Sequence, residues 1–131
     1  MLSALLPAYA LCIAPSCASF VRDVTDIELP WKVLASSGDM RLVEFVVRPS
    51  FAVDTIYLAG GFNDWTLPGG QGTGRVYEME YDSKRDYWVC RVWMRTGAWE
   101  YIYYDGILYF ADDKNAVARS DGNKISRMVV R

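Results

Sequence analysis

The sequence predicts an all-β protein folded as a two-layer sandwich. From about residue 40 onward, six or seven short runs rich in β-branched and aromatic residues recur at intervals of about 8 to 12 residues. Gly, Pro, Asp and Ser separate these runs, as expected for turns between strands. No segment keeps the helical apolar period, so little helix is expected beyond the N-terminal part. This pattern is typical of a β-sandwich, in which alternate residues of two sheets face each other.

Composition allows a single domain with its own core and argues against nucleic acid as a partner. The chain has 131 residues, of which 15% are aromatic, including nine Tyr and five Trp. This length is sufficient to bury a core without disulfides or metals. The net charge is -2, and Lys and Arg form no block. The sequence therefore gives no sign of a basic surface that could bind the phosphates of a nucleic acid.

The reactive residue types argue against catalysis. The chain contains no His, which removes the commonest general base and the commonest zinc ligand. Its cysteines, Cys12, Cys17 and Cys90, are odd in number and form no CxxC pair. Cys90 lies in a strand-like run and is expected to be a small apolar core residue. Acidic residues occupy turn positions and form no evident catalytic pair. We therefore predict no enzyme activity, no metal and no cofactor.

Residues 1–39 are expected to be an apolar segment and linker that precede a domain over residues 40–131. Residues 1–21 are uncharged and contain Pro7 and Pro15, which argue against a continuous membrane helix and stable membrane insertion. Three alternatives stay open: an export signal over residues 1–18, a segment that packs on the domain, and a poorly ordered extension. Localisation is undecided, although the lack of a basic residue before the apolar run favours cytoplasm over secretion. Trp31 is expected to anchor the linker on the domain.

The first half of the domain is expected to contain strands over residues 41–48, 53–59 and 76–81. The first ends before Pro49, which cannot donate to a β-ladder. In the third, alternation places Tyr77, Met79 and Tyr81 on one face. Between the second and third lies the segment 68–74 with four glycines, which predicts a flexible surface loop.

The second half is expected to contain strands over residues 87–94, 99–104, 107–110 and 124–130. A polar turn at residues 82–86 precedes the first of them. Asp105 and Gly106 tolerate positive φ and predict a hairpin between 99–104 and 107–110. Residues 112–122 are expected to form a loop before the last strand.

Several landmarks, in order, resemble the glycogen-binding modules of carbohydrate-binding family 48. This group includes a domain of AMP-activated kinase β subunits and the N-terminal domain of isoamylases and branching enzymes. The run 57–65 (YLAGGFNDW) is similar to the family's strand and turn, and Trp88 matches its middle-strand aromatic residue. The run 97–106 resembles its hairpin with one residue fewer, and 111–115 resembles the segment after it. The resemblance implies an immunoglobulin-like early-set β-sandwich.

The resemblance also implies an α-glucan site, with changes. The family builds this site from two tryptophans, a lysine and an asparagine. Trp65 matches the first tryptophan, whereas the lysine position falls on Tyr101 or Ile102 and the second tryptophan becomes Leu108 or Tyr109. Aromatic faces stack on the apolar face of glucose, while amides and hydroxyls pair with its hydroxyl groups. The residues expected at the site are Trp65, Asn63, Tyr101, Tyr109, Asn123 and Ser126.

Two functions follow as alternatives. In the first, the chain is a non-catalytic carbohydrate-binding module that recognises an α-glucan, such as glycogen or starch, by aromatic stacking. In the second, it is an early-set interaction domain or subunit beside a larger glucan enzyme or in a kinase-type complex, with sugar binding lost. The changed lysine and second tryptophan positions favour the second alternative, and the intact Trp65 favours the first.

Overall fold

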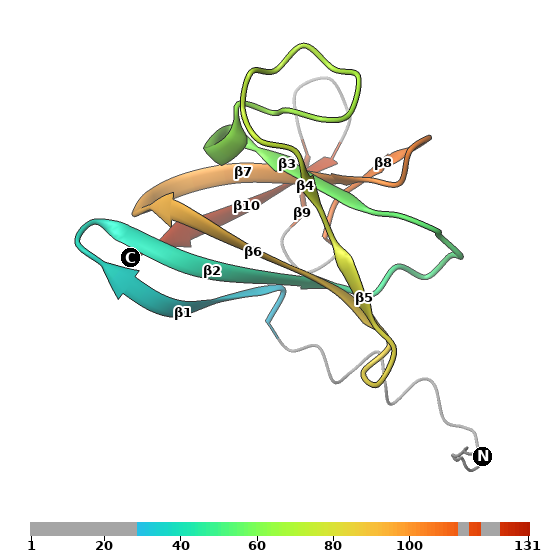
Figure 1. Ribbon diagram of the computed structural model, residues 1–131, viewed down its shortest axis with the longest axis horizontal. Coiled ribbons are helices and arrows are strands. Elements are labelled where there is room, and N and C mark those ends of the chain that lie inside the picture. Colours follow the sequence, from blue (N-terminus) through green and yellow to red (C-terminus); the bar gives the residue numbers. More distant parts are fainter. Residues whose placement is uncertain (1–28, 113–115, 119–123) are drawn as a thin grey trace.

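The fold is a sandwich of two antiparallel sheets, as the strand pattern predicts (Figure 1). The structure is a computed structural model, and it describes residues 29–112, 116–118 and 124–131. Residues 1–28, and with them the possible export signal, lie outside the described part. Within the described part, no helix is long and apolar enough to cross a membrane.

The first sheet has four strands in the order β1-β2-β6-β5. β2 (Met40–Val47) pairs with β6 (Tyr87–Arg95) over its whole length. β1 (Trp31–Ser37) and β5 (Glu80–Asp82) lie at the two edges. β-branched and aromatic residues are frequent in β2 and β6, in agreement with their central place in the sheet. The runs expected at residues 41–48 and 87–94 are therefore confirmed.

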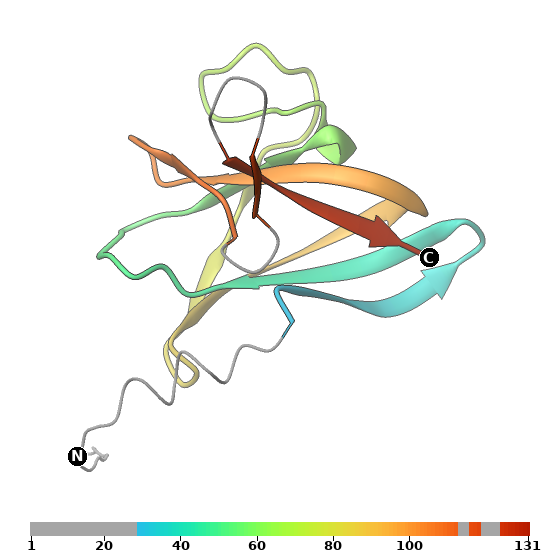
Figure 2. The ribbon, with the colours of Figure 1, turned by 180° about the vertical axis from the view of Figure 1, so that it is seen from behind.

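The second sheet has six strands, with β4-β3-β7-β10-β9 in order and β8 paired to the end of β7. Figure 2 shows β10 and the short β9 from behind. The strands are β3 (Tyr57–Gly60), β4 (Tyr77–Glu78), β7 (Gly97–Tyr104), β8 (Tyr109–Phe110), β9 (Ala116–Ala118) and β10 (Lys124–Val130). β9 lies inside the predicted loop 112–122, and β3 is shorter than the expected strand 53–59.

The core lies between the sheets and is built by alternation. Inward residues of β2 and β7 are fully or nearly fully buried, while their neighbours in the chain face outward. Phe45 packs edge-on against Tyr101, with ring centroids 5.1 Å apart. Burying such side chains stabilises the fold by about 1.5 to 3 kcal/mol each. The core residues are Val43, Phe45, Val47, Ile56, Leu58, Met79, Val92, Met94, Tyr101, Tyr103, Met128 and Val130.

The segment and linker expected over residues 1–39 contain an edge strand near their end. β1 pairs with β2 from Trp31 opposite Phe45 to Ser37 opposite Met40, with a register shift before Ala35. Gly38 turns the hairpin with a φ of 61°. Trp31 packs against the core, as expected for an anchor. The domain boundary predicted near Met40 therefore falls inside a hairpin, because a mostly exposed edge strand shows no apolar alternation that would reveal it.

The run expected as one strand at residues 76–81 is split between the sheets. β4 belongs to the second sheet and β5 to the first, and Met79 alone separates them. Met79 is buried, and its N–H donates to the carbonyl of Ile56 at 2.8 Å. Tyr81 is 49% exposed, so it does not share the buried face of Met79. Thr96 makes a second one-residue crossing, from β6 to β7.

Candidate functional site

The turn after β3 presents Trp65. The short 3-10 helix η1 (Gly61–Asn63) ends in two consecutive left-handed residues, Asp64 with a φ of 56° and Trp65 with a φ of 54°. Residues other than Gly rarely adopt this conformation, because the Cβ atom approaches the backbone. The Trp65 N–H donates to the Gly60 carbonyl at 2.9 Å and holds the turn. The Trp65 side chain is left 40% exposed.

Asn63 is a structural residue of this turn. It is 5% exposed, and its Oδ1 accepts from the Gly60 N–H at 3.0 Å. Its Nδ2 donates to the carbonyls of Thr66 (3.2 Å) and Arg75 (2.9 Å). Both amide donor hydrogens are thus used by the backbone. The expectation that Asn63 pairs with a sugar hydroxyl is corrected, because the amide is buried and occupied.

The glycine-rich loop after Trp65 is anchored at its far end. Thr66 Oγ1 accepts from the Gly74 N–H at 2.8 Å, and Asp64 Oδ2 accepts from the N–H and hydroxyl of Thr73, both at 3.2 Å. A Cβ atom on Gly74 would lie 2.2 Å from the Asn63 carbonyl oxygen, so glycine is needed for this close approach. The segment forms no strand, as expected, but the contacts fix its ends.

Tyr101 and Ser126 lie inside the sandwich. Both are fully buried and stand opposite each other on β7 and β10. The Tyr101 hydroxyl donates to Asp112 Oδ2 at 3.5 Å, and Ser126 Oγ accepts from the Asp112 N–H at 2.7 Å. They therefore fasten the chain after β8 to the sheet. The expectation that these two residues contact a glucan is corrected, because neither has exposed surface.

Tyr109 ends a row of three tyrosines across the outer face of the second sheet. Tyr57 pairs with Tyr104, and Tyr104 pairs with Tyr109, so the three share one register line. The rings of Tyr104 and Tyr109 stack with centroids 4.7 Å apart, and Tyr57 lies 6.4 Å from Tyr104. Tyr109 is 60% exposed. Sequence reasoning missed Tyr57 and Tyr104, since strand register cannot be read from a single run.

The β7–β8 turn leaves an apolar tip. Asp105 Oδ1 accepts from the N–H groups of Ile107 (2.8 Å) and Leu108 (2.7 Å). These two hydrogen bonds lower the pKa of Asp105 from its ordinary value. The side chains of Ile107 and Leu108 are 83% and 64% exposed. The hairpin is as predicted, but its two exposed aliphatic residues have no role in the sandwich core.

β3, which leads into the turn with Trp65, and β8, which carries Tyr109, lie on opposite edges of β7. Gly60 pairs with Tyr101 of β7 from one side, while Tyr109 pairs with Tyr104 from the other. Two strand spacings and three residues of β7 put the backbones of Gly60 and Tyr109 about 14 Å apart. The loop after Trp65 and β8 both lie at the upper side in Figures 1 and 2. An oligosaccharide of a few rings spans such a distance.

Two further residues singled out in the sequence are Asn123 and Cys90. Asn123 lies outside the described residues. Cys90 packs against the core, and burial raises its pKa to about 11, so the thiol is protonated at neutral pH. Within the described part, no three His, Cys, Asp or Glu residues are grouped so as to hold a metal ion.

No known family model matches the chain, and no curated protein matches its sequence. The resemblance to the glycogen-binding modules therefore rests on the landmarks in the sequence alone.

Proposed function

We propose that the chain is a non-catalytic carbohydrate-binding domain that recognises an α-glucan of the glycogen or starch type. The observation that supports it best is the exposed ring of Trp65 on two consecutive left-handed residues. Such strain persists only where the surroundings enforce it, and it concentrates at functional sites. Here the Asn63 amide and the anchored loop enforce it. A fixed indole offers glucose an apolar face at little entropic cost.

Tyr109 supplies a second stacking ring, supported from below by Tyr104. Stacking against Tyr104 restricts the Tyr109 ring before a ligand arrives. With Asn63, Tyr101 and Ser126 buried, hydrogen bonds to the sugar come from exposed groups such as the Asp64 carboxylate beside Trp65. Few such groups predict weak binding, with a Kd in the micromolar to millimolar range.

Affinity electrophoresis in gels that contain glycogen tests this function. The wild-type chain should be retarded relative to a glucan-free gel, and Trp65→Ala should lower the affinity about tenfold, equivalent to about 1.4 kcal/mol. Trp93 is the matched control, because it is 46% exposed on β6, in the other sheet. Trp93→Ala should bind as the wild type does. Equal migration of the wild type in both gels would overturn the proposal.

The second candidate, a protein-interaction domain, is favoured by the β7–β8 tip. Ile107 and Leu108 are exposed side by side, and adjacent exposed aliphatic residues are a feature of contact surfaces. A larger glucan enzyme or a kinase-type complex would be the partner. This function predicts co-purification that Leu108→Ser abolishes and Trp65→Ala leaves intact. The reverse response of the two variants would exclude it.

A further inference from the structure

An open groove of about 650 Å³ lies between the β2–β3 loop and the β5–β6 hairpin. The loop over residues 48–54 forms one wall, and Tyr81, Asp86 and Trp88 line the other. In Figure 1 this region lies at the lower right, away from the loop that follows Trp65. The groove is therefore distinct from the turn that carries Trp65.

Three aromatic side chains give the groove its apolar surface. Tyr81 and Trp88 contact each other with ring centroids 5.3 Å apart. Phe51 is held edge-on against Phe110 at 5.2 Å. Phe51 and Tyr81 are 44% and 49% exposed, so both rings have free surface. Ring surface held by a neighbouring ring is suited to stacking, because little side-chain freedom is lost on binding.

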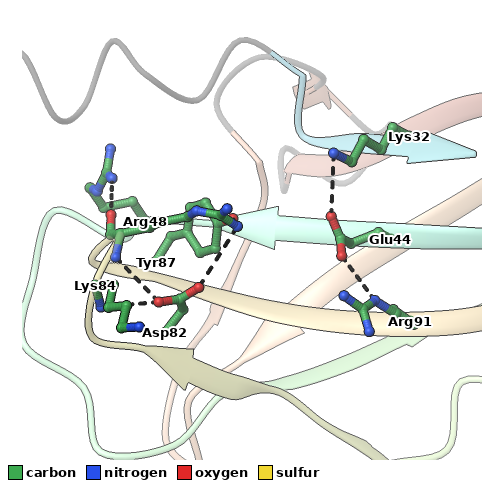
Figure 3. A network of polar contacts seen from close by, with 8 residues as sticks. Lys32, Glu44, Arg48, Asp82, Lys84, Tyr87 and Arg91 are labelled. Atoms are coloured by element: carbon green, nitrogen blue, oxygen red, sulfur yellow. Dashed lines mark hydrogen bonds and ion pairs between the residues drawn. The ribbon is translucent and has the colours of Figure 1, made fainter. Parts of the chain in front are cut away.

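Arg48 brings a buried hydrogen-bond donor to this groove. Its side chain is 10% exposed. Nε donates to the Asp86 carbonyl and Nη2 to the Arg85 carbonyl, both at 2.6 Å. Figure 3 shows Arg48 at the turn between β5 and β6. Nη1 is shielded from solvent and has no partner within the described part of the chain. A buried unpaired donor is rare and points to a missing acceptor.

Two carboxylates complete the lining. Asp86 accepts from the Tyr81 hydroxyl at 2.6 Å and lies 3.9 Å from Arg48 Nε, yet its side chain is 61% exposed. Asp54 is exposed on the loop wall. The groove thus presents one cation and two anions beside its aromatic surface. The two carboxylates disfavour an anionic ligand.

A neutral, hydroxyl-rich ring fits this mixture. Its hydroxyls donate to the carboxylates and accept from the guanidinium, while its apolar face lies on an aromatic ring. We propose that the groove is a second saccharide-binding site, with Tyr81 and Phe51 as stacking residues and Asp54, Asp86 and Arg48 as hydrogen-bonding residues. The choice of an α-glucan as the saccharide rests on the proposed function. Because Nη1 is shielded, a hydroxyl reaches it only when the loop wall shifts on binding.

Chemical-shift mapping of the 15N-labelled chain during titration with maltoheptaose tests the second site. The amides of residues 50–54 and 81–88 should shift in the wild type, and they should shift equally in Trp65→Ala. Tyr81→Ala should weaken the response of the groove about fivefold or more, and Asp54→Asn should weaken it less. Tyr81→Phe, which keeps the ring, is the matched control for stacking. Unchanged amide positions in β10, on the second sheet, confirm that each variant is folded.

The pattern of shifts separates this proposal from the proposed function. Shifts confined to residues 60–66 and 107–109 would overturn the groove site and leave the Trp65 surface intact. Shifts confined to the groove would support the second site and overturn the Trp65 surface. No shift at either place up to about 20 mM maltoheptaose would overturn both, because the Kd expected above is no higher than the millimolar range.

Discussion

The loop between β3 and β4, called the Trp65 loop below, and the β7–β8 turn have similar composition. Different hydrogen bonds fix the backbone of each. Both combine Gly and Asp, and both join strands at the second sheet. The buried Asn63 amide and the Thr66 hydroxyl bind the backbone of the first from within. One exposed carboxylate, that of Asp105, binds the backbone of the second.

The difference shows how a loop fixes a binding side chain. Buried hydrogen bonds cannot exchange with water, so they maintain the left-handed conformation at Trp65 against its cost. The Asp105 bonds are open to water and restrain only a tight turn. We therefore expect a preorganised indole in the first loop and independently moving aliphatic side chains at the tip of the second. Four variants test this contrast.

Asn63→Ala should have the largest effect. It removes three hydrogen bonds and leaves the Gly60 N–H and two carbonyls without their partner, so the free energy of unfolding should fall by about 3 kcal/mol. Urea unfolding followed by tryptophan fluorescence measures the change. Asp64→Ala is the control, because its carboxylate is exposed and its loss should cost less. A loss below about 1 kcal/mol for Asn63→Ala would contradict the contrast.

Gly74→Ala should lower the free energy of unfolding by about 2 kcal/mol, because the new Cβ would overlap the Asn63 carbonyl oxygen. Gly69→Ala is the control that shows the cost of an unfavourable backbone conformation without steric overlap. Gly69 has a φ of 73° but open space around its Cβ position. That variant should cost about 1 kcal/mol. Equal losses in the two variants would mean that the loop is not closely packed at Gly74.

Asp105→Ala should have a smaller, pH-dependent effect. The folded chain lowers the pKa of Asp105, so the stabilisation is present above the ordinary aspartate pKa of about 3.9 and is lost as the pH falls through the lowered value. The Tm of the variant should lie below that of the wild type at pH 6. The two Tm values should converge at low pH. A Tm difference that grows on acidification would contradict the role of the carboxylate.

Replacing Trp65 should affect stability least. Trp65→Gly removes the exposed ring and tolerates the left-handed conformation, whereas Trp65→Ala keeps the conformational cost. The Gly variant should be more stable than the Ala variant by about 0.5 kcal/mol, although both should bind glucan about tenfold more weakly than the wild type. Chemical denaturation of the two variants under one condition measures the difference. Lower stability of the Gly variant would show that the turn is not strained.

The sequence predicts the central strands well because alternation and β-branched residues record burial directly. Residues 41–48 and 87–94 carry this signal and correspond to β2 and β6. The residue pattern of one strand does not show how it pairs with its neighbours. The row of three tyrosines and the groove, which depend on that pairing, therefore could not be predicted from the sequence. Asn63 and Ser126 are polar but buried, because their side chains form hydrogen bonds with backbone groups inside the fold. A polar residue near a turn is therefore ambiguous until the contacts of the surrounding backbone are known.

The crossings at Met79 and Thr96 have a mechanical consequence. Each connects a strand of one sheet to a strand of the other through a single residue. A link this short allows almost no sliding, so displacement of either layer pulls directly on its partner. We therefore expect both sheets to lose protection of their amides from hydrogen exchange in one cooperative step. Unfolding of one sheet alone is not expected.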